Sequence, residues 1–513
     1  MPIVPARSAD LPLVLALDLG SSWLRAIVYD AQGREVAGTE GRTAWRWTRT
    51  PDGGVEGDPD ALLAGAFEAV DRAIAGAGGA AQEIRAVGVS TFWHNILGVG
   101  PDGRPTTPLY SWADERSAEA ARLLRHRMDE RTVHRRTGCV FHPSYPAARL
   151  LWLRGARPDA WRATRTWMSI GEYLALRCFG RAVCSVSMAS GSGLLDQDRC
   201  EWDAEVLGAI GLTPDRLAPL ADFKDPLAGL ASASAARWPA LTHVPWLPAA
   251  GDGALSNLGT GCVGPSRAAL AVGTSGAMRV LCRTAPAGLP PGLWRYRLDR
   301  DRRLVGGAVS NGGSIFRWMQ EQFALGAPEA IERELRLRRP DGHGLVVLPF
   351  LAGERSPHWP LRARGAVVGM TLATDPYDLL QAGLEAVAHR FALIWDQVRE
   401  TVPEVREIVA SGGALLHSPA WMQMIADVLG HEVIASAEAE GSSRGAALLA
   451  LELLGTVRAE DVPAPLGSVC SPDPERHARY REARTRHLRV EAVLGPLQEA
   501  VADNGGSPPD RVE

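Results

Sequence analysis

Two distant stretches of the chain share one pattern of apolar and polar positions. In the first, Leu13 to Leu17 is apolar, a Gly-Ser-Ser turn follows, and Arg25 to Tyr29 is again largely apolar. In the second, Ala268 to Val272 and Met278 to Cys282 enclose the turn Gly273-Thr274-Ser275-Gly276. Each stretch predicts a β-hairpin whose turn is rich in glycine and hydroxyl groups.

The segments that follow each hairpin also correspond. Ile84 to Ser90 and Ile408 to Ser411 have the apolar character of buried strands, and apolar residues recur at helical spacing in Asp60 to Gly76, Tyr377 to Arg399 and Pro419 to Leu429. A repeat of this length is too long for a solenoid unit and fits two copies of one α/β plan. We therefore expect an α/β protein with two similar domains.

The border between the two domains is predicted near residues 250–265, a stretch rich in glycine. The N-terminal domain would then comprise residues 1–255 and the C-terminal domain residues 256–493. Residues 494–513 include Asn-Gly-Gly-Ser-Pro-Pro-Asp, a composition typical of disorder, so we expect a disordered tail there.

The overall composition favours small-molecule partners. The chain has 513 residues, of which 46% are hydrophobic and 22% charged, and a net charge of only −4. That is enough apolar material for two or three buried cores. Because the charges are interspersed, no basic stripe predicts a nucleic-acid partner and no polybasic run predicts a membrane surface.

Cysteine usage and the N-terminus predict a cytoplasmic location. The seven cysteines are scattered and never spaced as CxxC, which argues against a disulfide framework and against a zinc site. The first residues lack the apolar core of a signal peptide, and no stretch approaches the ~18 uninterrupted apolar residues of a membrane span.

The cationic residues are almost all arginine, and Lys224 is the one lysine. A P-loop enzyme needs Gly-Lys-Ser/Thr, and a protein kinase needs a lysine on its third strand to hold the phosphates. If this protein transfers phosphate, it uses neither device.

The two hairpin turns are candidate phosphate-binding sites. Successive N–H groups in such a turn can converge on an anion, and two turns facing each other across a cleft could hold the β and γ phosphates of a nucleotide. Asp18, beside the first turn, can hold Mg²⁺ through water. The alternative is that both are ordinary tight turns and that Asp18 caps its own turn.

Six segments of the chain, taken together with their order and spacing, resemble the FGGY family of carbohydrate kinases. The resemblance covers nearly the whole chain. The matching segments are Asp18-Leu19-Gly20-Ser21-Ser22-Trp23-Leu24-Arg25 and Gly273-Thr274-Ser275-Gly276 (the two phosphate motifs), Gly251-Asp252-Gly253-Ala254 (the catalytic motif), Ser411-Gly412-Gly413-Ala414 (the adenosine motif), and Ser144 to Leu153 and Gly365 to Glu385 (two conserved blocks). The chain departs from the family pattern at Arg149, where lysine is usual, and at Pro360 and Gly383.

The resemblance implies two actin-like (ribonuclease H-like) domains facing each other across a catalytic cleft, with ATP and Mg²⁺ as cofactors. Asp252 would accept the proton of the attacking hydroxyl, and Arg25 would take the role of a lysine. The nucleotide-binding residues implied by the match are Asp18, Gly20, Ser21, Ser22, Arg25, Gly273, Thr274, Ser275, Gly412, Gly413, Ala414 and Ser418, with Asp18 at the metal. The sugar-binding residues implied are Trp93, His94, Asp114, Arg116, Ser144 and Asp252.

Within the family, Trp112 to Ser117, Gly253 to Gly259 and Gly306 to Gly313 resemble gluconate kinase-like members most. D-gluconate is therefore the expected substrate, with Arg116 as the partner of its carboxylate. A pentulose kinase such as xylulokinase is the nearest alternative. A nucleotide-driven binding protein of the actin or chaperone kind is an alternative from another class. A homodimer is the expected assembly if the chain associates.

Overall fold

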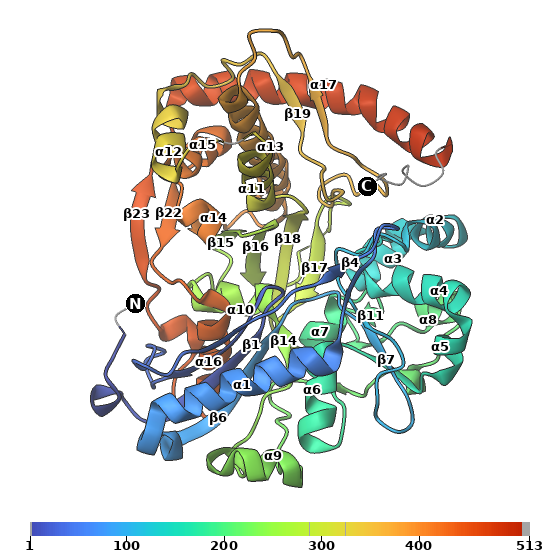
Figure 1. Cartoon of the computed structure of the whole chain (residues 1–513), viewed down its shortest axis with the longest axis vertical. Helices are drawn as coiled ribbons and strands as arrows, with labels where there is room; N and C mark the ends of the chain where they lie inside the picture. The colour runs from blue at the N-terminus through green and yellow to red at the C-terminus, as the bar shows by residue number, and fades with distance from the viewer. Residues whose placement is uncertain (1–2, 287, 324, 505–513) are drawn as a thin grey trace.

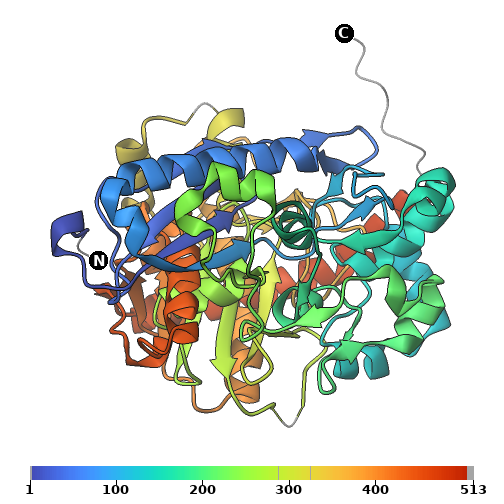
Figure 2. The ribbon, with the colours of Figure 1, turned by 90° about the horizontal axis from the view of Figure 1, so that it is seen from below.

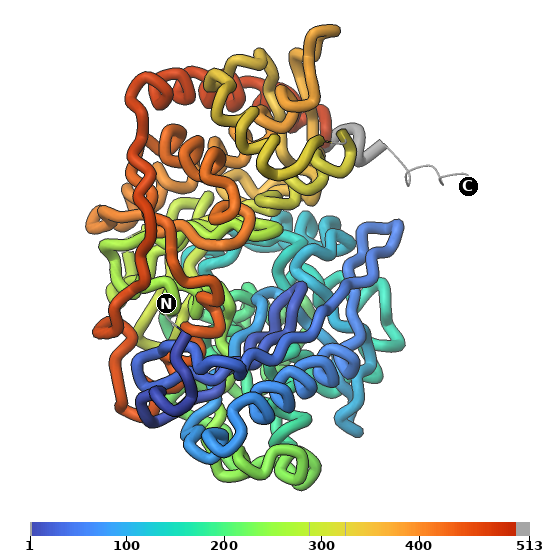
Figure 3. The backbone as a smooth tube through the Cα atoms, turned by 60° about the vertical axis from the view of Figure 1, so that its left-hand side comes forward, coloured from blue at the N-terminus to red at the C-terminus, as the bar shows by residue number. Residues whose placement is uncertain are grey.

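The computed structural model describes residues 3–286, 288–323 and 325–504, and it has two α/β halves. In Figure 1 most of the N-terminal half lies below and most of the C-terminal half lies above. The tube view of Figure 3 shows the same division, with the orange-red segment that contains helix α16 running down beside the blue N-terminal segment. After forming most of the second half, the chain therefore runs back to pack against the first half.

The N-terminal sheet has five strands in the order β3-β2-β1-β6-β14. Strands β1, β2 and β3 are antiparallel neighbours, whereas β6 lies parallel to β1 and to β14. The bounds are β1 (Leu13–Leu19), β2 (Trp23–Tyr29), β3 (Gly41–Ala44), β6 (Ile84–Thr91) and β14 (Ala250–Gly251).

The C-terminal sheet has seven strands in the order β17-β18-β16-β15-β21-β22-β23. Five of these strands, β18-β16-β15-β21-β22, repeat the strand directions of the N-terminal sheet: the first three are antiparallel neighbours, and the last three are parallel. The bounds are β17 (Trp294–Arg297), β18 (Arg303–Val309), β16 (Gly276–Cys282), β15 (Arg267–Val272), β21 (Glu407–Ser411), β22 (Val433–Ser436) and β23 (Leu466–Cys470). The predicted duplication of one α/β plan is confirmed.

Helices cover both sheets. Helix α1 (Pro59–Ala77) packs on β2 and β3 and is the long blue helix along one side of the molecule in Figure 2. Helices α13 (Pro376–Thr401) and α15 (Pro419–Leu429) pack on each other in the second half. The remaining α-helices are α2 (Ala118–Arg127), α3 (Glu130–Thr137), α4 (Pro146–Ala156), α5 (Pro158–Ala163), α6 (Ile170–Phe179), α7 (Val186–Ser190), α8 (Ala204–Ile210), α9 (Ser232–Arg237), α10 (Asp252–Gly259), α11 (Gly313–Gln322), α12 (Pro328–Leu337), α14 (Gly413–Leu416), α16 (Gly441–Leu453) and α17 (Pro474–Asn504).

Short strands complete the structure. They form small sheets on the first half and one two-stranded sheet on the second. Their bounds are β4 (Thr48–Arg49), β5 (Val55–Gly57), β7 (Leu97–Val99), β8 (Leu109–Tyr110), β9 (Thr166–Met168), β10 (Cys184–Ser185), β11 (Leu195–Asp196), β12 (Glu201–Trp202), β13 (Leu220–Ala221), β19 (Val346–Leu348) and β20 (Ala366–Val368).

Helices α10 and α16 join the two halves. Each follows the last parallel strand of its central five, and the two helices pack against each other through glycine. A Cβ atom at Gly445 would lie 1.9 Å from the carbonyl oxygen of Leu255, and one at Gly259 would lie 1.9 Å from that of Gly441. Only glycine allows the two backbones to approach so closely.

A hydrophobic core shared by both halves supports this joint. Trp93 and Tyr145 of the first half pack with Trp294, Tyr296 and Leu448 of the second in a single buried cluster. Each half also has a core of its own. The expected border near residues 250–265 therefore coincides with α10, but it is a packed joint and not a linker.

The predicted start of a disordered tail at residue 494 is wrong. Helix α17 continues through Leu494 to Asn504, so these residues are helical, and residues 505–513 lie outside the described residues. The helix is anchored upstream, where Tyr480 is 1% exposed and Glu491 pairs with Arg390 at 2.8 Å. Composition alone did not reveal these anchors.

None of the described helices is both long enough and apolar enough to cross a membrane.

Candidate active site

A cleft of about 770 Å³ between the two halves contains most of the residues that the sequence singled out. Both hairpin turns reach it, as does the first turn of α10. The predicted residues that line it are Asp18, Gly20, Ser21, Ser22, Arg25, Trp93, His94, Ser144, Asp252, Gly273, Thr274 and Ser275. Six others do not line it: Asp114, Arg116, Gly412, Gly413, Ala414 and Ser418.

The two hairpin turns offer unused N–H groups to the cleft. Within the described residues, the backbone N–H groups of Ser21, Ser22, Thr274 and Ser275 donate no hydrogen bond to protein. The carbonyl oxygens of the first turn are engaged, since that of Ser21 accepts from the indole N–H of Trp47 at 2.8 Å. Both turns thus present donors to the cleft, an arrangement that suits an anion.

Glycine has a different role in each turn. A Cβ at Gly20 would lie 2.6 Å from the carbonyl oxygen of Trp23, so glycine is required to close the first hairpin. A Cβ at Gly273 would meet no atom within 4 Å, and it would project into the cleft that this residue lines. Gly273 has no positive φ, so its backbone accepts other residues.

Asp18, at the end of β1, carries a buried oxygen without a partner. Its Oδ1 atom makes no hydrogen bond within the described residues, although the residue is only 4% exposed. Burial raises the pKa of Asp18, against the opposing effects of the Ser90 hydroxyl and the charge of Arg25. Arg25 lies 3.7 Å from Asp18 and 3.0 Å from Glu440. An orphaned carboxylate oxygen in a polar cleft is suited to a hydrated cation such as Mg²⁺.

Glu440 is a carboxylate paired with the cleft residue Arg25, and the sequence analysis missed it. It directly precedes α16, and burial raises its pKa to about 7, with Arg25 opposing and Asp18 adding to the rise. Its position depends on the return of the chain to the first half, so no local pattern could reveal it.

Asp252 begins α10 and lines the same cleft as the two turns. Its Oδ1 accepts a hydrogen bond from the N–H of Gly253 at 2.7 Å. Burial raises the pKa of Asp252 to about 6; the charge of Asp18 adds to the rise, and that of Arg279 opposes it. A carboxylate with such a pKa is ionised at neutral pH and can accept a proton.

Aromatic side chains enclose the end of the cleft beyond Asp252. The ring of Trp93 lies 4.9 Å from that of Tyr296, and its indole N–H donates to the carbonyl oxygen of Ser187. His94 has φ of 63°, and its Nδ1 lies 2.5 Å from the carbonyl oxygen of Gly191. Burial lowers the pKa of His94 to about 3, so its ring is uncharged.

Arg149 holds the loops that carry His94 and Ser144. Its guanidinium is fully buried and donates to the carbonyl oxygens of His94 and Pro143, each at 2.8 Å. The positive φ of His94 is a strained conformation, and such strain persists only where surrounding contacts hold it. Arginine at this position therefore positions both loops at the cleft.

Arg116 and Asp114 pair with each other outside the cleft lining. Arg116 donates to Asp114 and to Glu56, each at 2.6 Å, and its guanidinium lies 4.7 Å from the ring centre of Trp152. Oδ2 of Asp114 also accepts a hydrogen bond from the N–H of Val55 at 3.1 Å. Asp114, Glu56 and, at 3.8 Å, Asp52 already neutralise Arg116, so the predicted contact between Arg116 and a substrate carboxylate has no support in this geometry.

The predicted adenosine segment lies beside the second hairpin turn. Gly412 has φ of 91°, and a Cβ there would lie 2.4 Å from the carbonyl oxygen of Val272. Ala414 packs against Gly313, whose N–H donates to the carbonyl oxygen of Gly273 at 2.7 Å. A hollow of about 560 Å³ adjoins this segment, between α12 and His417.

Ser418 caps a helix. Its side chain accepts from the N–H of Trp421 at 3.3 Å, at the start of α15, and donates to Glu332. Ser418 is only 5% exposed and does not line the hollow. The structure therefore shows it as a helix cap and not as part of a nucleotide-binding surface.

Arg279 and Arg355 are two charged cleft residues that the sequence analysis did not predict. Both line the cleft near Asp252 and are buried. Arg279 lies mid-strand in β16, and Arg355 follows Glu354 in an irregular loop. Neither belongs to a turn or a helix start, which were the signals that identified the other residues.

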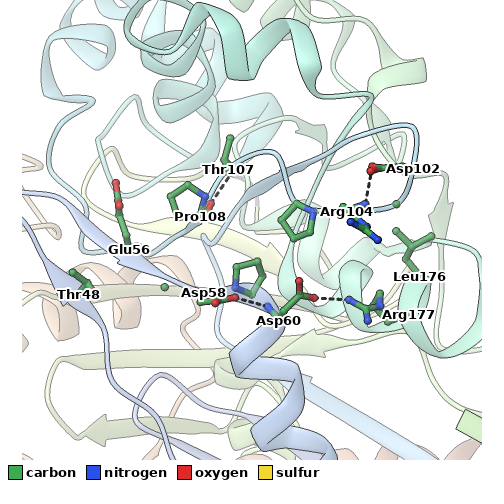
Figure 4. A pocket seen from close by; sticks show the side chains of 14 residues that line it. Thr48, Glu56, Asp58, Asp60, Asp102, Arg104, Thr107, Pro108, Leu176 and Arg177 are labelled. Carbon is green, nitrogen blue, oxygen red and sulfur yellow. Dashed lines mark hydrogen bonds and ion pairs between the residues drawn. The ribbon is translucent and has the colours of Figure 1, made fainter. Parts of the chain in front are cut away.

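Figure 4 shows a separate hollow of about 970 Å³ near the start of α1. Its carboxylates already accept hydrogen bonds: Asp58 from the N–H of Asp60, Asp60 from Arg177, and Asp102 from the N–H of Arg104. None of the predicted site residues lines it. The cleft between the halves is therefore the candidate active site.

Comparison with known proteins agrees with this geometry. The chain is 27% identical to a gluconokinase of Bacillus subtilis (strain 168) over 508 residues, covering 96% of this chain and 98% of that protein. The crystal structure of gluconate kinase from Lactobacillus acidophilus matches with a TM-score of 0.84 and 25% identity, covering 94% of this chain and 98% of that one. A xylulose kinase from the same organism matches with a TM-score of 0.85 and 26% identity, over 94% and 98%.

These structures confirm the predicted fold of two actin-like domains. The model described as the N-terminal domain of the FGGY family of carbohydrate kinases matches residues 13–259, and the model for its C-terminal domain matches residues 268–452. Family membership excludes the actin or chaperone alternative, because the relatives are named as kinases of small carbohydrates. The chain belongs to the FGGY family of carbohydrate kinases.

Proposed function

We propose that this carbohydrate kinase transfers the γ-phosphoryl group of ATP to a hydroxyl of a small sugar acid, with D-gluconate as the preferred substrate. The observation that carries the proposal is the position of Asp252, a carboxylate in a cleft whose two hairpin turns have free N–H groups. The sugar lies mainly against the first domain and the nucleotide mainly against the second.

Asp252 acts as the general base. Its carboxylate accepts the proton of the substrate hydroxyl as the hydroxyl oxygen bonds to the γ-phosphorus, and the bond to the bridging oxygen breaks to release ADP. Phosphoryl transfer asks for little covalent chemistry from the protein, so positioning and charge stabilisation dominate. The free N–H groups of Ser21, Ser22, Thr274 and Ser275 supply that stabilisation at the phosphates.

Asp18 holds Mg²⁺, and its orphaned buried Oδ1 supports this role. Bound Mg²⁺ would neutralise charge on the nucleotide phosphates. Arg25, which pairs with Glu440 and Asp18, supplies the positive charge that a lysine supplies in other kinases. Gly412, Gly413 and Ala414 contact the adenosine, whose base extends toward the hollow beside His417.

The substrate proposal is tested by ATP consumption on a panel of D-gluconate, D-xylulose and glycerol. We expect ADP release to depend on added sugar and kcat/KM to be highest with D-gluconate. Equal or higher kcat/KM with D-xylulose would favour the alternative, a pentulose kinase. The similarity to both gluconate and xylulose kinases makes this comparison the decisive one.

The assembly and location remain predictions of the sequence. A homodimer would double the chain mass of 54.9 kDa, which light scattering measures directly. Fractionation of the source cells tests the predicted cytoplasmic location.

A further inference from the structure

Arg355 lines the cleft, and its guanidinium forms no close ion pair with a carboxylate of the described residues. The residue is 7% exposed, and its Nη2 donates to the carbonyl oxygen of Val309 at 2.9 Å. Its Nε atom is buried and has no hydrogen-bond partner. Among the described residues, no carboxylate oxygen lies within 4.0 Å of its guanidinium nitrogens.

The adjacent carboxylate, Glu354, is engaged elsewhere. Its Oε1 accepts from the N–H groups of Ser310 and Arg355 at 3.2 and 2.7 Å. Its Oε2 lies 3.4 Å from Nε of Arg390, which also pairs with Glu491. Glu354 thus fixes the backbone of the loop, and its close ion pair is with Arg390 and not with Arg355.

The surroundings of Arg355 make a lone charge costly. Its guanidinium lies 4.8 Å from the ring centre of Trp112, and Tyr145 and Trp359 line the same part of the cleft. His94 is uncharged there. A buried charge without a partner is unfavourable, and the usual remedy is an ion of opposite sign.

We propose that Arg355 binds the carboxylate of the sugar acid, an inference that rests on the proposed function. The planar guanidinium can form paired hydrogen bonds with a carboxylate, and its free Nε is one of the donors this requires. Trp112, which contacts Arg355, and Asp252 line the same cleft and would bound the space for the hydroxylated chain of the acid.

Other arginines fit this role less well. Arg116 is neutralised by Asp114 and Glu56 and does not line the cleft. Arg279 donates through Nε to Asn257 at 3.2 Å, so its corresponding donor is occupied. A nucleotide phosphate is the other anion that could reach Arg355, and the test below separates it from a carboxylate.

The experiment compares D-gluconate with D-glucitol, which differ only at the carbon that carries the carboxylate. In Arg355→Gln we expect kcat/KM for D-gluconate to fall at least about tenfold, the effect of losing hydrogen bonds to a charged group. The value for D-glucitol should change by less than about threefold, because no carboxylate is present. Arg355→Lys should retain part of the D-gluconate activity, since lysine keeps the positive charge but not the paired N–H donors of the guanidinium.

Calorimetry with an ATP analogue and the matched variant Arg116→Gln complete the test. Unchanged nucleotide affinity in Arg355→Gln supports the carboxylate contact, whereas a loss of affinity overturns it in favour of a phosphate. Equal losses for both sugars, or a selective loss of D-gluconate activity in Arg116→Gln, also overturn it. If the parent enzyme neither binds nor phosphorylates D-gluconate, the proposed substrate fails instead, which is a distinct result.

Discussion

Asp252 combines a raised pKa with a position at the start of a helix. Its pKa of about 6, set mainly by burial, leaves the carboxylate ionised at neutral pH and protonated in mild acid. As pH rises through 6, Asp252 loses its proton and gains the ability to accept one. We therefore expect kcat/KM for the best sugar to rise with pH, with a midpoint near 6.

Asp252→Asn removes the base and keeps the size of the side chain. We expect kcat to fall about 10²–10⁴-fold, and the step near pH 6 to disappear from the profile. Steady-state kinetics measures both effects, and calorimetry should show sugar and ATP-analogue affinities close to those of the parent. Turnover within about threefold of the parent, with both ligands bound, would show that Asp252 is only a turn residue.

The two hairpin turns differ in what they tolerate, although their sequences correspond. Gly273→Val should leave the fold intact, because the site has open space and no positive φ. The new side chain would occupy the space at the turn where phosphate binds, so we expect nucleotide affinity to be lost. Calorimetry with an ATP analogue, beside circular dichroism for the fold, makes the measurement.

Gly20→Val serves as the contrasting variant for this experiment. Its Cβ would meet the carbonyl oxygen of Trp23 at 2.6 Å, so this change should lower the melting temperature as well. Normal affinity in a folded Gly273→Val protein would remove the second turn from the proposed nucleotide site.

The contact between α10 and α16 depends on glycine. Gly445→Ala would place a Cβ 1.9 Å from the carbonyl oxygen of Leu255 and force the helices apart. We expect a loss of about 1–3 kcal/mol in the free energy of unfolding, the usual cost of overpacking, measured by urea denaturation.

Gly208 provides the matched control within a helix. It is exposed on α8, and a Cβ there would meet no atom within 4 Å. Gly208→Ala should be neutral or stabilise by about 0.5–1 kcal/mol, because alanine is the better helix former. Equal effects of the two changes would mean that the helix contact does not require glycine.

At the scale of the whole molecule, α17 ties the end of the chain to the loop behind the cleft. Glu491 pairs with buried Arg390 and accepts from His358 at 2.8 Å. Deleting residues 474–513 should lower the melting temperature strongly, because Tyr480 and Glu491 are lost.

Glu491→Gln tests the contribution of the ion pair between Glu491 and Arg390 without shortening the chain. Losing the charged partner of Arg390 should cost about 1.5–3 kcal/mol of stability, measured by urea denaturation near neutral pH. Burial opposes ionisation of Glu491, but His358 and Arg390 outweigh it and lower its pKa to about 2. The stabilising charge is therefore present above the unfolded pKa and is lost as pH falls through 2. Wild-type stability in the variant would show that α17 is held by packing alone.

The sequence by itself determined the duplicated plan, the two hairpins and the main helices. These features are encoded locally: apolar periodicity predicts each strand or helix, and glycine in a hairpin turn marks a tight backbone path. Asp252 stood out only through the resemblance to a known family, because Asp-Gly alone also fits an ordinary turn. The resemblance to a known family then supplied the order of the motifs along nearly the whole chain.

Only the tertiary structure decided which charges face the cleft. Arg116 was predicted there, but it pairs with Glu56, which is 60 residues away, whereas Arg355 lies in the cleft and keeps a free donor. Ser418 likewise became a helix cap, and residues 494–504 became helical. An ion pair depends on groups brought together by folding, and burial sets its strength. No local pattern contains that information, so a neutralised arginine and an available one look alike in sequence.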